Sequence, residues 1–143
     1  SASRAMRRAS RSVRPANVSW EPWVEYEHLP AELQRAGCAL GVFGTGEKTS
    51  RVIPNKAFQA LACGRPLVTA DTPAARELLT DGVDALLVPA GDAAALAAAV
   101  QALAADAALA ERVGAAGRAT YEARASEAVL GVVWRSILER ALR

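Results

Sequence analysis

The sequence is poor in histidine, cysteine and aromatic residues, the types that build most metal sites, disulfide frameworks and stacking surfaces. Its 143 residues include one histidine, two cysteines and 5% aromatic residues. Cys38 and Cys63 fall in apolar stretches and are expected to be reduced core residues of a cytoplasmic protein, without a disulfide or a metal. His28 precedes an expected helix, where capping is the usual role, and no chemical role is assigned to it.

Lysine, net charge and long apolar runs are also scarce. The net charge of +2 is too small to indicate a nucleic-acid partner. No apolar run reaches the ~18 residues of a membrane-spanning helix, and no signal peptide is recognised. Arginine is abundant but the only lysines are Lys48 and Lys56, which sets Lys56 apart from the general surface charge. The length and the 52% hydrophobic content are those of one globular domain.

What the sequence does contain is a helix-and-strand pattern from Val52 to Ala70. Pro54 suits the first turn of a helix, because the amide that it lacks would be unpaired there. Gly64 is typical of the left-handed residue that follows a helix, and Pro66 prevents continuation. The apolar face of this helix is expected to be Ala57, Phe58, Leu61 and Ala62.

The start of the same helix predicts an anion site. Ile53 has no side-chain oxygen to cap the free amides that follow it. Lys56 places a cation in the first turn, where the helix dipole disfavours it by about 0.3–1 kcal/mol. Uncapped amides beside a cation suit a phosphate. The alternative is that Lys56 points into water and that solvent satisfies the amides.

This stretch resembles the nucleotide-sugar-binding half of the GT-B glycosyltransferases, which have two facing Rossmann-like domains. The large retaining group of bacterial enzymes reads P-x-K-x-x-E-x-(M/L)-A-x-G-x-P here. The matching positions are Pro54, Lys56, Gln59 in place of the glutamate, Leu61, Ala62, Gly64 and Pro66. The similarity continues through Thr72–Asp92 and covers nearly the whole chain.

The resemblance implies an α/β fold, a Rossmann-like parallel sheet flanked by helices. Such a domain has six strands in the order 3-2-1-4-5-6. The third to sixth are expected at Asn17–Trp20, Cys38–Phe43 (buried on both faces), Pro66–Ala70 and Ala85–Val88. We therefore expect residues 1–143 to be a partial donor-binding domain that lacks its first two strands and the acceptor domain. The remaining part of the same protein, or a partner chain, would supply them, and the chain alone would not catalyse.

Helices are expected between and after these strands. The expected helices are Ser1–Val13, Leu29–Ala36, one to Leu79 capped by Thr72, one to about Ala104 capped by Asp92, one from Asp106 to about Arg124, and a last one capped by Ser126. The apolar stripe of the last helix is Val129, Leu130, Val133, Ile137 and Leu138. Trp134 either packs in the core or, as the resemblance suggests, contacts the other domain.

The N-terminal helix is strongly basic, with arginines on one side at positions 4, 7, 8 and 11. One interpretation is attraction to an anionic membrane surface, which suits enzymes that glycosylate lipid-linked acceptors. The other is a solvated helix face, favoured because bulky apolar residues are missing. Peripheral association of the full enzyme with the inner face of the membrane stays open.

The resemblance also implies a donor site outside the carboxyl ends of the strands. Lys56 and the amides at Asn55 and Lys56 would neutralise the leaving diphosphate in place of a divalent metal. Thr45, in the Gly44–Ile53 loop, would lie near the phosphates or the sugar. Val24 would line the nucleobase pocket, and Trp23 and Tyr26 are further candidates there. No cofactor is expected; the nucleotide-diphosphate sugar is a substrate.

Two positions depart from the commoner family pattern of two glutamates eight residues apart. Gln59 replaces the second, which holds the ribose, and keeps two hydrogen-bonding functions. Arg51 replaces the first and offers only donors and charge, suited to a phosphate or an acidic sugar. Glu47 is a nearby carboxylate, either a sugar contact or a solvated loop residue. No residue is assigned as catalytic.

The expected function is retaining, metal-independent transfer of a sugar to a glycan or lipid-linked acceptor. Because of Gln59 and Arg51, a catalytically inactive nucleotide-sugar-binding module remains an alternative. A dinucleotide-binding Rossmann domain is a further one, although the glycine-rich turn and the acid that it needs are not found.

Overall fold

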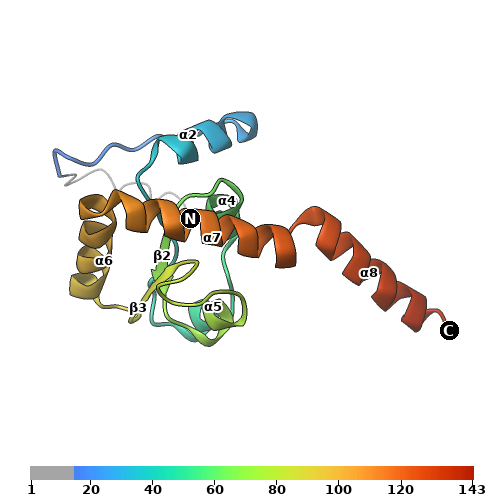
Figure 1. Cartoon of the computed structure of the whole chain (residues 1–143). Helices are drawn as coiled ribbons and strands as arrows, with labels where there is room; N and C mark the ends of the chain where they lie inside the picture. Colours follow the sequence, from blue (N-terminus) through green and yellow to red (C-terminus); the bar gives the residue numbers. More distant parts are fainter. Residues whose placement is uncertain (1–14) are drawn as a thin grey trace, which may run out of the picture.

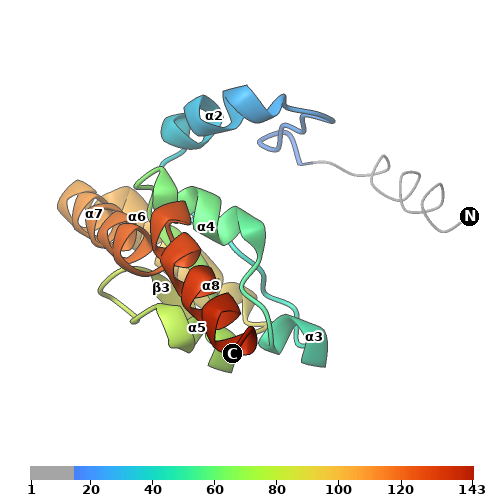
Figure 2. The ribbon, with the colours of Figure 1, turned by 90° about the vertical axis from the view of Figure 1, so that its right-hand side faces the viewer.

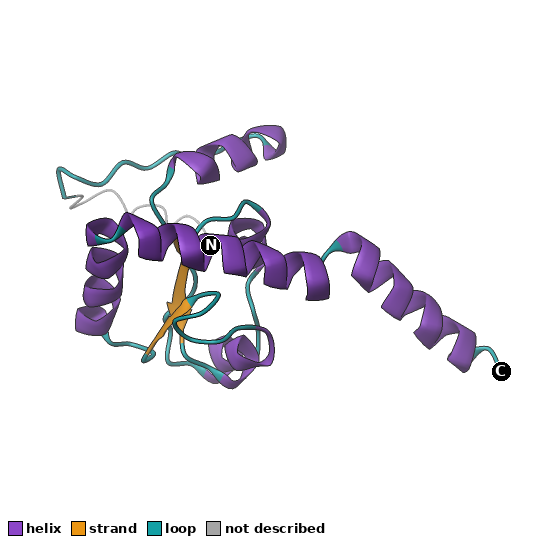
Figure 3. Ribbon diagram, in the orientation of Figure 1, coloured by secondary structure: helices purple, strands orange, loops and turns teal. Residues whose placement is uncertain are grey.

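The computed structural model of the chain describes residues 15–143. Helices dominate, and short strands lie between them (Figures 1 and 3). In chain order the elements are η1 (Tyr26–His28), α2 (Leu29–Arg35), β1 (Ala39–Leu40), α3 (Glu47–Ser50), α4 (Asn55–Ala62), β2 (Leu67–Ala70), α5 (Pro73–Leu78), β3 (Leu86–Val88), α6 (Ala93–Ala105), α7 (Ala107–Arg124) and α8 (Glu127–Ala141). The basic helix expected over Ser1–Val13 lies outside the described residues.

The described strands form one parallel sheet in the order β1-β2-β3. Leu40 of β1 pairs with Val68 of β2, and Val68 pairs with Leu86 of β3. All residues of β2 are buried, as its mainly apolar sequence predicts for a central parallel strand. The sheet and its helices confirm the expected α/β fold with a Rossmann-like parallel sheet flanked by helices.

Alternate residues of β2 and β3 enter separate hydrophobic clusters, one on each face of the sheet. Leu67 and Leu87 join the cluster formed with α4 and α5, whereas Val68 and Val88 join the one covered by α6. This alternation follows from the two-residue period of a strand. Tyr121 of α7 packs against the first cluster, so α7 closes the same face as α4.

The sequence correctly predicts where most helices start. The side chains of Thr72, Asp92, Asp106 and Ser126 each accept a hydrogen bond from the backbone amide three residues later. These polar caps satisfy amides that a helix leaves unpaired. His28 occupies the N-cap position of α2, but its side chain is exposed and makes no capping bond, so the expectation of a cap is wrong there.

Two strand predictions are wrong or too long. Residues 17–20 form no strand and are exposed, because within residues 15–143 no neighbouring segment pairs with them. Ladder pairing defines only Ala39–Leu40 within the expected Cys38–Phe43 strand. This strand lies at the edge of the described sheet, and Leu40 is 46% exposed, so it is not buried on both faces.

Helix α8 projects away from the rest of the chain (Figure 1) and points toward the viewer in Figure 2. None of its residues is buried, and the expected apolar stripe is largely open to solvent. Trp134 is 61% exposed, which excludes the interpretation that it packs in the core of this chain. Among the described residues, no single helix is long and apolar enough to cross a membrane. One pair, Ala93–Ala105 with Ala107–Ala141, reaches that length and composition only across a bend of 105°.

Candidate functional site

Helix α4 begins without a side-chain cap. Pro54 occupies the N-cap position, so the helix starts at Asn55, one residue later than expected, and its first turn carries no acidic residue. The amides of Asn55 and Lys56 make no hydrogen bond within the described part of the chain. The first paired amide is that of Ala57, 2.9 Å from the Pro54 carbonyl oxygen. Both residues are exposed, so free N–H groups and an ammonium face solvent together, a pattern that favours anions.

The opposite end of α4 is fixed by close packing. Gly64 has φ +65° and its amide donates to the Leu61 carbonyl at 2.9 Å, which ends the helix as the sequence predicts. Gly114 of α7 lies so close to this turn that a Cβ there would come within 2.4 Å of the Gly64 carbonyl oxygen. Ala57, Ala60 and Leu61 are fully buried beneath the helix. The buried face therefore holds α4 rigidly, while its tip stays accessible.

The segment before α4 is not the plain loop that was expected over Gly44–Ile53, because α3 forms within it. The Thr49 hydroxyl lies 2.8 Å from the Gly44 carbonyl oxygen and 2.6 Å from the Gly46 carbonyl oxygen, which share its single proton, and this contact stabilises the tight turn. Arg51, just after α3, forms an ion pair with Glu47 one turn earlier. Both side chains are largely exposed, so the pair is weak and easily opened.

Thr45 lies at the carboxyl end of the sheet, next to the turn that follows β3. The Gly91 amide donates to the Phe43 carbonyl at 2.9 Å, which ties the loops after β1 and β3 together. A Cβ at Gly91 would meet the Thr45 methyl group at 2.9 Å. The Thr45 side chain is nevertheless exposed, and its hydroxyl makes no hydrogen bond within residues 15–143. Its position therefore suits contact with a ligand at the carboxyl end of the sheet.

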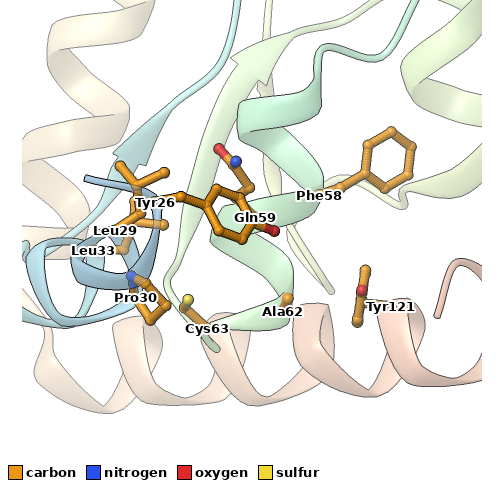
Figure 4. A pocket seen from close by; sticks show the side chains of 9 residues that line it. All are labelled: Tyr26, Leu29, Pro30, Leu33, Phe58, Gln59, Ala62, Cys63 and Tyr121. Carbon is orange, nitrogen blue, oxygen red and sulfur yellow. The ribbon is translucent and has the colours of Figure 1, made fainter. Parts of the chain in front are cut away.

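A pocket of about 220 Å³ opens along α4 beyond its tip. Figure 4 shows walls from η1 and α2 on one side, α4 in the centre and α7 below. The lining residues are Tyr26, Leu29, Pro30, Leu33, Phe58, Gln59, Ala62, Cys63 and Tyr121. The side-chain amide of Gln59 and the hydroxyls of Tyr26 and Tyr121 make no hydrogen bond to the described residues. An apolar cavity with a few free polar groups is the usual form of a ligand site.

The structure brings some of the predicted site residues together and leaves others apart. Asn55, Lys56 and Gln59 share α4, and Asn55 and Gln59 lie four residues apart on one face. Val24 is half-buried but is not among the residues that line the pocket. Trp23 is 73% exposed, its indole N–H donates to the Glu25 carboxylate, and it is not among the residues that line the pocket, whereas Tyr26 is.

Several pocket residues were not predicted as ligand contacts, and Tyr121 is the one among them that carries a hydroxyl group. It follows the glycines Gly114 and Gly117 at helical spacing, on the side of α7 that faces α4. This run of small residues ending in an aromatic residue was the available signal, since small residues let two helices approach closely. The pairing of α7 with α4 is a tertiary contact and was not predicted.

Neither cysteine is fully buried, although Cys38 packs against the hydrophobic cluster that α6 covers. Cys38 and Cys63 are free and half-buried, and Cys63 lines the pocket. Burial raises the pKa of the Cys38 thiol, so the nucleophilic thiolate is disfavoured at neutral pH. Within residues 15–143 no group of three histidine, cysteine, aspartate or glutamate side chains is arranged to hold a metal ion.

Comparison with known proteins gives consistent matches. The family described as glycosyl transferases group 1 matches residues 2–106. A phosphatidyl-myo-inositol mannosyltransferase from Mycobacterium leprae (strain TN) is 41% identical over 85 residues, which are 59% of this chain and 21% of that enzyme. A sucrose-phosphate synthase structure from Thermosynechococcus elongatus has a similar fold, with TM-score 0.70 and 24% identity over 97% of this chain and 34% of that one. The chain thus spans about a fifth to a third of the proteins that it resembles.

Proposed function

The chain belongs to the group 1 glycosyl transferases, and its fold is that of part of a GT-B enzyme. From this premise we propose that it binds the donor in an enzyme that transfers a sugar from a nucleotide-diphosphate sugar. The acceptor would be a glycan or a lipid-linked molecule. The name of the mannosyltransferase described above supports both parts of this proposal. Mannosyl transfer supports a hexose donor, and phosphatidyl-myo-inositol supports a lipid-linked acceptor. A lipid-linked acceptor would also bring the full enzyme to the membrane surface.

The uncapped tip of α4 is the observation that carries this proposal. In the proposed complex, the amides of Asn55 and Lys56 donate to the diphosphate, and the Lys56 ammonium neutralises its charge. Charge-assisted hydrogen bonds of this kind contribute about 1.5–3 kcal/mol each. As the sugar–phosphate bond breaks, negative charge builds on the leaving diphosphate, so these donors stabilise the transition state more than the ground state. In this proposal Lys56 has the role that a divalent cation fills elsewhere.

The other predicted residues extend the same site. Gln59 lies one turn beyond the tip and would hold the ribose hydroxyls through its amide. Thr45 and Arg51 belong to the segment after β1, and in this proposal they contact the phosphates or the sugar. Arg51 is paired with Glu47, so that pair would have to open before Arg51 reached the donor. Stereochemical retention is part of the proposal and is tested by the anomeric configuration of the product.

Replacement of Lys56 tests the proposal directly. In the full-length protein, Lys56→Ala should reduce kcat by about 10²–10³, the effect of losing one transition-state donor. Lys48→Ala is a matched control, since Lys48 is the other lysine of the chain and lies on α3. It should keep kcat within about twofold. If Lys56→Ala and wild type had equal kcat values, Lys56 would have no part in the mechanism. In a separate test, loss of turnover after a chelator removes divalent metals would contradict a metal-independent reaction.

A donor-binding protein without catalysis is the second candidate. The replacement of both family glutamates by Arg51 and Gln59 favours it, because neither side chain provides a carboxylate near the sugar. Calorimetry with nucleoside diphosphates, combined with an assay of donor turnover on the full-length protein, separates the two. Tight binding without turnover identifies the inactive module.

A further inference from the structure

The pocket lies along α4 beyond the proposed diphosphate site, and Gln59 of α4 is one of its lining residues. Asn55, Gln59 and Cys63 follow one another at intervals of four residues and therefore lie on one face of the helix. Gln59 is about 6 Å along the helix axis from the tip, at 1.5 Å per residue. A diphosphate held at the tip would therefore direct its nucleoside along this face and into the pocket.

The size and lining of the pocket suit the base better than the whole donor. Its volume of about 220 Å³ is below the range of about 300–1,000 Å³ for complete small-molecule sites. The lining is mainly aliphatic and aromatic, with Tyr26 at the exposed rim and Phe58 on α4. A heterocyclic base suits a pocket of this size and lining better than a sugar with its many hydroxyl groups does.

Tyr121 contributes a fixed polar group to this pocket. Its ring packs against the buried cluster beneath α4, which anchors the side chain. Its hydroxyl makes no hydrogen bond to the described residues. Tyr121 also lies beyond residues 2–106, the part of the chain that the family match covers. Its contribution to the pocket is therefore additional to the features on which family membership rests.

We propose that Tyr121 is a specificity-determining residue that selects the nucleobase of the donor through its hydroxyl. This inference rests on the proposed function, since it requires a nucleotide at the α4 tip. A phenolic hydroxyl both donates and accepts, so it pairs with the edge of one base and leaves another base with an unpaired group. A site that forms a hydrogen bond to its ligand rejects analogues that cannot form it, because a buried polar group is then left unsatisfied.

The test compares binding of four nucleoside diphosphates, UDP, GDP, ADP and CDP, by calorimetry on the full-length protein. Tyr121→Phe keeps the anchored ring and removes only the hydroxyl. It should narrow the ratio of Kd values between the weakest and the tightest of the four by about tenfold. The affinity for inorganic pyrophosphate should stay unchanged. Glu122→Gln alters the next residue of α7, which is outside the pocket, and should leave the ratio within about twofold.

The outcomes separate this inference from the function on which it rests. An unchanged ratio in Tyr121→Phe overturns the inference, as does equal affinity of the wild type for all four ligands. Uniform weakening of every ligand, pyrophosphate included, assigns Tyr121 a structural role and overturns it as well. Lys56→Ala should weaken pyrophosphate and all four nucleotides together. Failure of that result contradicts the proposed diphosphate site, whatever Tyr121→Phe shows.

Discussion

The contact between α7 and the end of α4 leads to a prediction about Gly114. In Gly114→Ala, the new Cβ would lie 2.4 Å from the Gly64 carbonyl oxygen and 3.3 Å from a ring carbon of Pro66. The first of these atoms is backbone in a turn with φ +65°, so it cannot move aside as a flexible side chain would. Overpacking of this kind costs about 1–3 kcal/mol. We expect the upper part of that range because backbone must shift.

A competing effect sets the net magnitude. Alanine is favoured over glycine in a helix interior by about 1 kcal/mol, so Gly114→Ala should lose about 1–2 kcal/mol of unfolding free energy overall. Gly131, in the interior of α8, is the matched control because a Cβ there meets nothing within 4 Å. Gly131→Ala should therefore gain up to about 1 kcal/mol from the same change in helix propensity.

Urea unfolding of the two variants beside wild type measures the difference directly. Thermal unfolding provides a second measurement: for a protein of this size each kcal/mol corresponds to about 3–4 °C in Tm, and the two variants should shift Tm in opposite directions. Because the same turn fixes α4, Gly114→Ala should also weaken pyrophosphate binding at the tip. If Gly114→Ala proved as stable as Gly131→Ala, the close contact between α7 and Gly64 would not be what fixes α4.

Two further predictions concern side chains that support the sheet. Asp84 is 6% exposed, and its carboxylate accepts hydrogen bonds from the Thr80 amide at 2.7 Å and the Thr120 hydroxyl at 2.8 Å. Asp84→Ala should therefore lower the free energy of unfolding, measured in urea, by about 1–3 kcal/mol. A smaller loss in Asp84→Ala than in Thr120→Val would contradict the idea that Asp84 is the centre of these hydrogen bonds. Hydrogen bonding from Arg76 lowers the pKa of Asp71 in the folded protein. The pair should therefore stabilise the fold at pH values above the pKa of Asp71 in the unfolded chain, which is about 3.9. This stabilisation should be lost as the pH falls through the lower pKa that Asp71 has in the folded protein. The exposure of both side chains to solvent keeps this stabilisation small. Asp71→Asn should make the free energy of unfolding depend less on pH below about pH 4. The same pH dependence in Asp71→Asn and wild type would refute the link between this ion pair and stability.

Local sequence chemistry predicted the elements whose determinants lie close together in the chain. The caps at Thr72, Asp92, Asp106 and Ser126 depend on a side-chain oxygen and an amide three residues away. The end of α4 depends on glycine at position 64. The same local information identified an uncapped first turn at Asn55 and Lys56, although Pro54 proved to be the cap position.

Predictions that needed a distant partner were less successful. Residues 17–20 have a strand-like composition, but a strand exists only where a neighbour accepts its hydrogen bonds. Burial of β1 likewise depends on what lies beyond the edge of the sheet. Helix α8 has an amphipathic sequence, but no part of residues 15–143 packs over its apolar face. The family resemblance was confirmed by matches to the group 1 glycosyl transferases, whereas the individual donor contacts remain predictions.

The sequence by itself determined that the chain forms a parallel α/β domain and that α4 begins with free amides beside a lysine. The first follows from the family resemblance together with the succession of apolar strands and amphipathic helices, and the second follows from the absence of a capping oxygen, a property of neighbouring residues. Only the tertiary structure decided that Tyr121 shares a pocket with Gln59 and that Gly114 fixes the end of α4. Those contacts join residues far apart in the chain, and packing in three dimensions brings them together.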